Sequence, residues 1–126
     1  MADELTVTAS LAFNTTNITE TINAGTLLID VSTLTQASGI QAVGHSSHAA
    51  IENSGAANGG FFFFRNIDST NFIEIGRTSN DAIGGTFRPF LKLLPGEYSI
   101  GRASEADLYA QADTATVNLQ YRMFNV

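Results

Sequence analysis

Hydrophobic and polar residues alternate with a period of two along much of the chain. In the segment ELTVTASLAFN, every second position is apolar and mostly polar residues stand between these positions, which are Leu5, Val7, Ala9, Leu11 and Phe13. The closing segment ATVNLQYRMF alternates in the same way. Successive side chains of a β-strand point to opposite faces, so this pattern predicts strands with one buried face.

Further strands are predicted between turn-forming residues. They cover residues 18–25, 26–36, 40–50, 61–65, 72–77, 86–94, 98–103 and 108–112. Ala24 and Gly25 are expected to end the first of these strands. Pro95 and Gly96 form a strong turn signal, because proline presets its own φ and glycine accepts a positive φ. Pro89 cannot donate to a strand ladder, which predicts that its strand lies at an edge or contains a bulge.

No segment repeats apolar residues at the 3.6-residue period of an amphipathic helix. The best helical candidate is residues 104–115, where Ser104 is a suitable cap, and the same segment also fits a loop that enters a strand. Many short strands with frequent turns predict an all-β fold: a single antiparallel β-sandwich (jelly-roll-like) or a barrel, with little helix. The length of 126 residues predicts one β-sandwich domain over residues 1–126.

The chain is acidic and carries few charges. Its formal net charge is -6, only 14% of its residues are charged, and its Lys and Arg residues are scattered singly. Binding to a phosphate backbone needs clustered basic residues, so the composition argues against a nucleic-acid partner. The low charge, with 44% hydrophobic residues, indicates that neighbouring proteins cover some of the surface. We identify no signal peptide and no apolar run long enough to span a membrane.

The sequence predicts no catalytic site, metal site or cofactor. It contains no cysteine, and its two histidines, His45 and His48, lie in a segment of small residues without further zinc ligands nearby. The segment DSTN from Asp68 to Asn71 is explained by turn chemistry, and a calcium site would need more converging carboxylates. Neither a G-x-S-x-G nucleophile elbow nor a G-x-x-x-x-G-K phosphate loop is present.

The run FFFF at residues 61–64 raises the question of what covers both faces of one strand. The odd-numbered pair points to one face and the even-numbered pair to the other. One pair can enter the core, and the second needs a cover from the same chain or from another subunit. We expect the second pair to line a subunit interface of a homo-oligomer, with a trimer as the leading guess. The candidate interface residues are Phe61, Phe62, Phe63, Phe64, Ile73 and Ile75.

The C-terminal half resembles a group of small bacteriophage virion proteins. Their shared outline is N-x-D-x-T-N-F/Y-I-x-I-G, then F-x-P-F-x-K-L-x-P-G-E, then L-x-A-Q-A and a closing strand of the type L-x-Y. This chain has those elements at residues 66–76, 87–97, 108–112 and 119–121. The N-terminal half supports the resemblance less.

The resemblance implies a phage structural β-domain without an active site. Such proteins look like capsid decoration (cement) proteins, which sit on the outer shell and clamp neighbouring capsomers, often as trimers. We therefore expect a virion protein, made in the bacterial host cytoplasm, that binds the major capsid protein on the outer capsid surface and stabilises the shell. The alternatives are a tail or fibre-attachment module, or a glycan-binding β-sandwich that uses Tyr98, Tyr109 and Tyr121.

Overall fold

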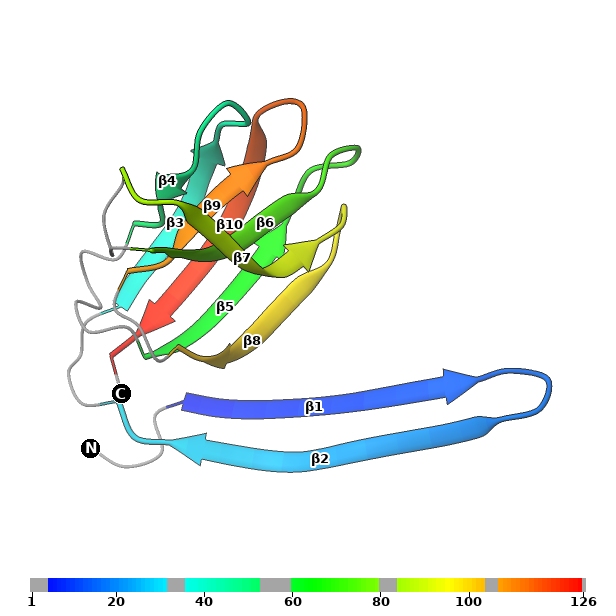
Figure 1. Cartoon of the computed structure of the whole chain (residues 1–126). Coiled ribbons are helices and arrows are strands. Elements are labelled where there is room, and N and C mark those ends of the chain that lie inside the picture. The colour runs from blue at the N-terminus through cyan, green and yellow to red at the C-terminus, as the bar shows by residue number, and fades with distance from the viewer. Residues whose placement is uncertain (1–4, 32–35, 53–59, 80–83, 104–106, 126) are drawn as a thin grey trace. The chain divides into compact units, whose positions relative to one another are not determined.

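The computed structural model describes residues 5–31, 36–52, 60–79, 84–103 and 107–125. These residues form ten strands and no helix (Figure 1). The prediction of an all-β fold with little helix is therefore confirmed. The helical candidate at residues 104–115 lies partly outside the described residues, and its described part contains strand β9 (Tyr109–Ala112). Strand β9 pairs with β4 on one side and with β6 on the other. Of the two interpretations of this segment, the one in which it enters a strand is therefore correct.

The chain divides into two compact units. The first comprises Met1–Thr33 with Val126, and the second comprises Leu34–Asn125. Strands β1 (Leu5–Asn14) and β2 (Thr19–Ile29) belong to the first unit, and the other strands belong to the second. The prediction of one domain over residues 1–126 stays a prediction, but both four-stranded sheets lie within the second unit.

The first unit is a long antiparallel hairpin of β1 and β2. Its turn is closed by Thr15, whose backbone N–H donates to the carbonyl oxygen of Ile18 at 2.7 Å. The Ile18 N–H in turn donates to the Thr15 hydroxyl oxygen at 3.2 Å. These bonds form a turn at the polar segment NTTN, which joins β1 to β2.

A β-bulge at Ala24 keeps β2 continuous. Ala9 pairs with Gly25 and Ser10 pairs with Asn23, so Ala24 is one extra residue on β2. Gly25 has a φ of 77°, and its N–H donates to the Asn23 side-chain oxygen at 3.0 Å. The prediction that Ala24 and Gly25 end a strand is wrong, because the positive φ of Gly25 serves a bulge here instead of a chain reversal.

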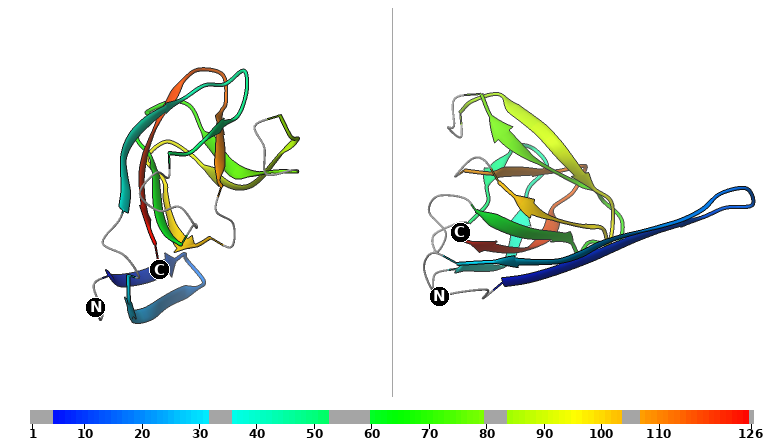
Figure 2. Two further views of the ribbon diagram at one scale, coloured as in Figure 1. Left: turned by 90° about the vertical axis from the view of Figure 1, so that its left-hand side faces the viewer. Right: turned by 90° about the horizontal axis from the view of Figure 1, so that it is seen from below.

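Two four-stranded antiparallel sheets form a β-sandwich in the second unit (Figures 1 and 2). The first sheet has the order β3-β10-β5-β8 and consists of Gln36–Val43, Val117–Phe124, Phe61–Asn66 and Tyr98–Arg102. The second sheet has the order β4-β9-β6-β7, in which β4 is Ala49–Ala50, β6 is Ile73–Thr78 and β7 is Phe87–Leu93. The predicted strand at residues 40–50 is therefore two strands, which lie in different sheets.

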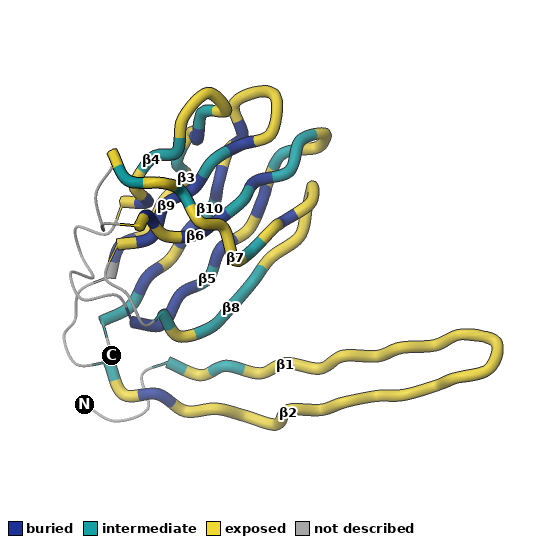
Figure 3. Tube along the Cα trace, in the orientation of Figure 1, coloured by how far each residue is buried: buried dark blue, intermediate teal, exposed yellow. Residues whose placement is uncertain are grey.

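Alternate side chains of the two sheets fill the space between them. Phe62, Phe64 and Leu119 enter this core from the first sheet, and Ile73 and Ile75 enter it from the second. All five are buried, as the dark blue segments of Figure 3 show for their strands. Burying one such side chain contributes roughly 1.5–3 kcal/mol to stability.

Strand β7 is both an edge strand and a bulged strand. It lies at the end of the second sheet, and its pairing shifts from Ile75–Leu91 to Gly76–Pro89, which leaves one extra residue on β7. Both possibilities that Pro89 predicts are thus confirmed. Gly76 permits the close approach at the bulge, because a Cβ atom there would overlap the carbonyl oxygen of Arg88.

Candidate functional site

The four phenylalanines divide between the core and the outer face of the first sheet. Phe64 and Phe62 lie in the core, where their rings stack with centroids 4.6 Å apart. Phe61 and Phe63 occupy the outward positions of β5. Phe61 is buried, whereas Phe63 is half-buried and stacks on Tyr98 with ring centroids 6.1 Å apart. The even-numbered pair is therefore the pair that fills the core. The subunit interface stays a prediction, and Phe63 is the residue of the odd-numbered pair that is accessible to a partner.

Ile73 and Ile75 are not surface residues. Both have 0% of their area exposed and pack in the core of the sandwich. The sequence predicts both as residues of the same interface as the phenylalanines. That assignment is corrected, because alternation on β6 points both side chains toward the first sheet.

The apolar surface that sequence reasoning missed lies on the β1–β2 hairpin, which we call the arm. Strand pairing places the alternating residues of β1 opposite apolar residues of β2, with Val7 opposite Leu27 and Leu11 opposite Ile22. One side of the hairpin, the arm face, is therefore almost continuously apolar. It comprises Leu5, Val7, Ala9, Leu11, Phe13, Ile22, Leu27 and Ile29, with Glu20 and Gly25.

The opposite side of the arm is mostly polar. It carries the Thr and Ser residues of β1, and these pair with Thr and Asn residues of β2 and with Leu28. The arm is therefore amphipathic: one face is apolar and the other is polar, as in a sheet that packs with one face on a core. Its alternating pattern was visible in the sequence, but the pattern does not say which molecule covers the apolar face.

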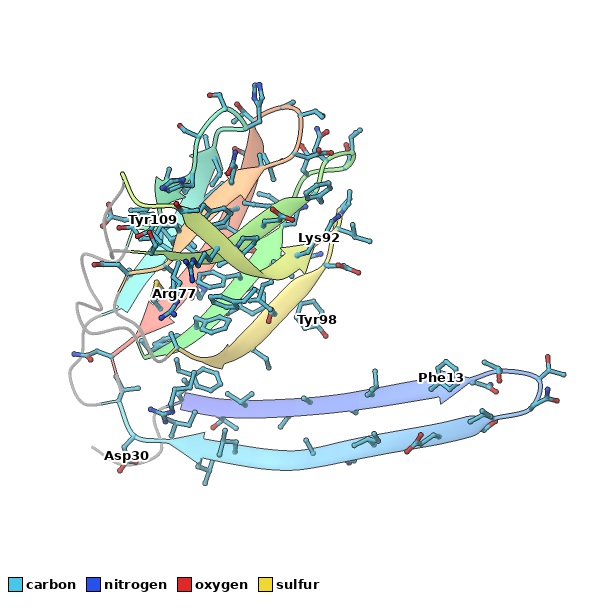
Figure 4. The ribbon with its side chains drawn as sticks, viewed as in Figure 1. Phe13, Asp30, Arg77, Lys92, Tyr98 and Tyr109 are labelled. Carbon is cyan, nitrogen blue, oxygen red and sulfur yellow. The ribbon has the colours of Figure 1, made fainter. Side chains whose placement is uncertain are left out.

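The arm face is exposed over much of its length (Figure 3). Leu11 is 64% exposed, and Phe13, Ile22 and Leu27 are each more than half exposed. Figure 4 labels Phe13, which lies close to the turn at the end of β1. A two-stranded hairpin is only marginally stable in water unless its apolar face packs against something. Such a surface is typical of a segment that binds another protein.

The outer face of the first sheet is a second candidate surface. Strand pairing and alternation place Ile40, Phe63, Tyr98 and Ile100 on it. Ile40 and Tyr98 are 64% and 65% exposed, and the other two are half-buried. We call this surface the outer sheet face.

The charges on the outer sheet face are all positive within the described strands. Arg65, Arg102 and Arg122 occupy outward positions, and no Asp or Glu does. Three of the six basic residues of an acidic chain therefore gather on one sheet. This sheet combines exposed apolar side chains with guanidinium groups, a composition that favours an acidic protein surface as partner.

The motifs that carry the phage resemblance join at one end of the sandwich. The buried side chain of Asn66 donates to the carbonyl oxygens of Asn71 at 2.9 Å and of Leu93 at 3.0 Å. The backbone N–H of Gly96 donates to the Asn66 carbonyl oxygen at 3.0 Å. The Leu94 N–H donates to the Glu97 carboxylate at 2.8 Å. These residues therefore have structural roles in holding two turns together.

Asp68 also has a turn role. Its carboxylate accepts hydrogen bonds from the backbone N–H groups of Asn71 at 2.6 Å and Thr70 at 2.7 Å. These bonds lower the pKa of Asp68 below its ordinary value of 3.8. Within the part of the chain that the structure describes, no three His, Asp or Glu side chains gather as potential metal ligands.

The two histidines do not come together. His45 is exposed, and its carbonyl oxygen accepts a hydrogen bond from the Gln111 side chain. His48 packs as an aromatic residue: its ring stacks on Phe87 with centroids 5.4 Å apart and meets Tyr109 edge-on at 5.6 Å. His48 therefore helps to pack β4 against β7 and β9.

The three tyrosines do not form one aromatic platform. Tyr98 is exposed on the outer sheet face (Figure 4), whereas Tyr109 and Tyr121 are buried. Burial raises the pKa of Tyr121 above its ordinary value of 10.0, and the nearby Glu52 carboxylate raises it further. Two of the three tyrosines suggested for glycan binding are therefore not available on the surface.

One cavity of about 420 Å³ opens between the edge strands β7 and β8. Its volume lies in the range of small-molecule sites. It is lined by Phe62, Arg77, Phe90, Leu91, Ser99, Ile100, Arg102, Ala103 and Leu108. These lining residues include no carboxylate and no histidine, so they provide no pair of groups for acid–base chemistry.

Comparison with protein-family models, with curated proteins and with solved structures finds no match to this chain. Across the described residues, no helix has the length and apolar character that crossing a membrane requires.

Proposed function

We propose that this chain is a capsid decoration (cement) protein of a bacteriophage, which binds the outer surface of the major capsid lattice and stabilises the shell without catalysis. The observation that carries this proposal is the exposed arm face. Leu11 and Ile22 face each other across the hairpin and are both more than half exposed. An exposed apolar surface of this length is typical of a site that binds another protein.

The second unit supports the same role. Its sandwich is a compact body whose core holds large side chains from both sheets. Phe63, Ile40 and the arginines of the outer sheet face give that body a further protein-binding surface. A repeating shell lets many such modest contacts act together, so that their combined effect exceeds any single affinity.

The alternatives have less support in the side chains. A glycan-binding sandwich needs exposed aromatic rings with polar groups beside them, and Tyr98 alone among the three tyrosines is exposed. An enzyme needs acid, base or nucleophile groups close together, and His45 and His48 serve separate local contacts. A tail module shares the non-catalytic role with a decoration protein and differs from it in copy number.

Copy number and position in the virion test the proposal. The protein would be quantified in purified particles against the major capsid protein, and its density would be located by cryo-electron microscopy. We expect a copy number equal to, or a simple fraction of, that of the major capsid protein, with density over the outer shell. Density confined to the tail, at a small copy number, would overturn the decoration role.

Shells that lack the protein test the stabilising role. Such shells should assemble and then release DNA at a lower temperature than complete particles. Adding the purified protein should restore the release temperature. Equal heat resistance with and without the protein would contradict the proposed function.

A paired substitution tests the arm face. The double variant Leu11→Ser/Ile22→Ser removes two exposed apolar side chains that pair across the arm. Each buried aliphatic side chain is worth roughly 1.5–3 kcal/mol, so shell binding should weaken by about two orders of magnitude or more. The neighbouring pair on the polar side provides the matched control, Ala12→Ser/Thr21→Ser, which should bind as the unmodified protein does.

A further inference from the structure

The arm and the outer sheet face carry opposite charges. Glu20 lies on the arm face, and strands β1 and β2 contain no Lys or Arg and no other Asp or Glu. The outer sheet face carries Arg65, Arg102 and Arg122, with no acidic residue at the outward positions of its described strands. Electrostatic complementarity of this kind selects partners and orients them.

Both surfaces also need an apolar partner. Leu11 on the arm face and Ile40 on the outer sheet face are each 64% exposed, so at these residues neither surface is covered from within its own unit. Both are faces of β-sheets, and apolar sheet faces pack against each other at a spacing of about 10 Å. Each surface therefore offers the apolar side chains and the sign of charge that complement the other.

We infer that the arm face of one copy packs on the outer sheet face of a second copy of this chain. The inference rests on the proposed function in one respect, which is that the arm is a protein-binding surface. The partner that we infer for it is a second copy of the chain. Glu20 lies on the arm face opposite Phe13, so packing of this kind brings a carboxylate to a surface that carries three arginines.

Charge argues against the competing arrangement in which two arms pack face to face. That contact would place two Glu20 carboxylates on one apolar interface and would leave the arginines of both sheets without the acidic surface that complements them. Contact between an arm and a sheet uses two different surfaces, so it is heterologous. Such contacts close into a ring when the rotation between copies permits, which is compatible with the trimer predicted from the sequence.

Cysteine-specific cross-linking tests the inference, because the chain has no cysteine of its own. One copy would carry Ala9→Cys on the arm face, and a second copy, distinguished by an affinity tag, would carry Ser38→Cys on the outer sheet face. The two would be mixed at micromolar concentration and treated with a short bis-maleimide. We expect a product that contains one tagged and one untagged chain.

The matched control moves the arm cysteine to the other side of the same strand. Ala12→Cys is exposed like Ala9→Cys but lies on the polar side of the arm. We expect the mixed product to form at least several-fold more slowly with Ala12→Cys. Two further variants, Leu11→Ser/Ile22→Ser on the arm and Arg65→Glu/Arg122→Glu on the sheet, should each reduce the product with Ala9→Cys at least tenfold. Circular dichroism would confirm that every variant keeps its β signal.

Three outcomes would overturn the inference. Equal cross-linking from Ala9→Cys and Ala12→Cys would show that the arm face is not the contact. A link formed only within one chain of the double variant Ala9→Cys/Ser38→Cys would show that each copy covers its own sheet. A protein that is monomeric by light scattering and gives no mixed product would leave the shell as the partner of the arm. These experiments use the isolated protein, so such a failure is distinct from a failure of the virion measurements.

Discussion

The side-chain amide of Asn66 donates a 3.0 Å hydrogen bond to the carbonyl oxygen of Leu93, and so links β5 in the first sheet to β7 in the second. The same amide donates to Asn71, and its oxygen accepts from the N–H of Asp68 at 2.9 Å. Asn66 is fully buried, so these bonds satisfy polar groups that water does not reach. One side chain therefore sets the positions of two turns.

Replacing Asn66 should destabilise the sandwich. Asn66→Ala leaves the Leu93 carbonyl oxygen and the Asp68 N–H without their partner, which should cost roughly 2–4 kcal/mol of unfolding free energy. Urea unfolding followed by circular dichroism measures this loss. Asn118→Ala removes an exposed asparagine side chain from β10 and should change stability by less than about 0.5 kcal/mol. Equal stability of the two variants would show that the bonds of Asn66 contribute little.

Gly76 should tolerate no side chain. A Cβ atom there would overlap the Arg88 carbonyl oxygen and lie 2.6 Å from the Cα of Pro89, and both are backbone atoms that rotamer changes cannot move. Gly76→Ala should therefore cost about 1–3 kcal/mol or more, with the loss seen in the urea midpoint. Gly44→Ala is the matched control, because a Cβ atom there has no neighbour within 4 Å. A Gly76→Ala protein as stable as the control would contradict the tight pairing of β6 with β7.

Asp68 should make stability depend on pH in the acid range. Hydrogen bonds from Asn71 and Thr70 lower its pKa in the folded state. The ionised carboxylate is therefore more stable in the folded protein than in the unfolded chain. Its contribution is present above pH 3.8 and is lost as the pH falls below 3.8 through the folded pKa. Melting temperatures at low salt should therefore fall less steeply with acid in Asp68→Asn. Asp113→Asn removes one exposed carboxylate and is the matched control for the change in net charge.

Period-two alternation predicted strands β1 and β10 but not what covers them. Leu11 and Leu119 stand at equivalent positions of two alternating segments, yet Leu11 is 64% exposed and Leu119 is fully buried. The difference lies in the partner: Leu119 meets a second sheet, whereas Leu11 belongs to a two-stranded sheet. Alternation records which residues share a face, and the cover of that face depends on distant segments. The arm face could therefore not be identified as a candidate surface from the sequence.

Glycine signals were similarly incomplete. Gly25 and Gly96 have nearly the same φ, 77° and 81°. Gly96 lies in the predicted turn between β7 and β8, whereas Gly25 lies inside β2 at a bulge. A positive φ is a local property, and whether the chain reverses there depends on the pairing of the residues on both sides. Predicting where a strand ends near such a glycine therefore requires the pairing register as well as the sequence.

The phenylalanine run should separate stability from association. Phe64→Ala removes a fully buried ring from the core and should cost about 3–5 kcal/mol of unfolding free energy. Phe63→Ala removes a half-buried ring from the outer sheet face, so it should cost clearly less stability and should weaken association between copies. Urea unfolding at low protein concentration measures the first effect, and sedimentation velocity over a concentration series measures the second. Phe63→Tyr keeps the aromatic ring and should restore association. If Phe63→Ala associates as the unmodified protein does, the outer sheet face is not the contact between copies.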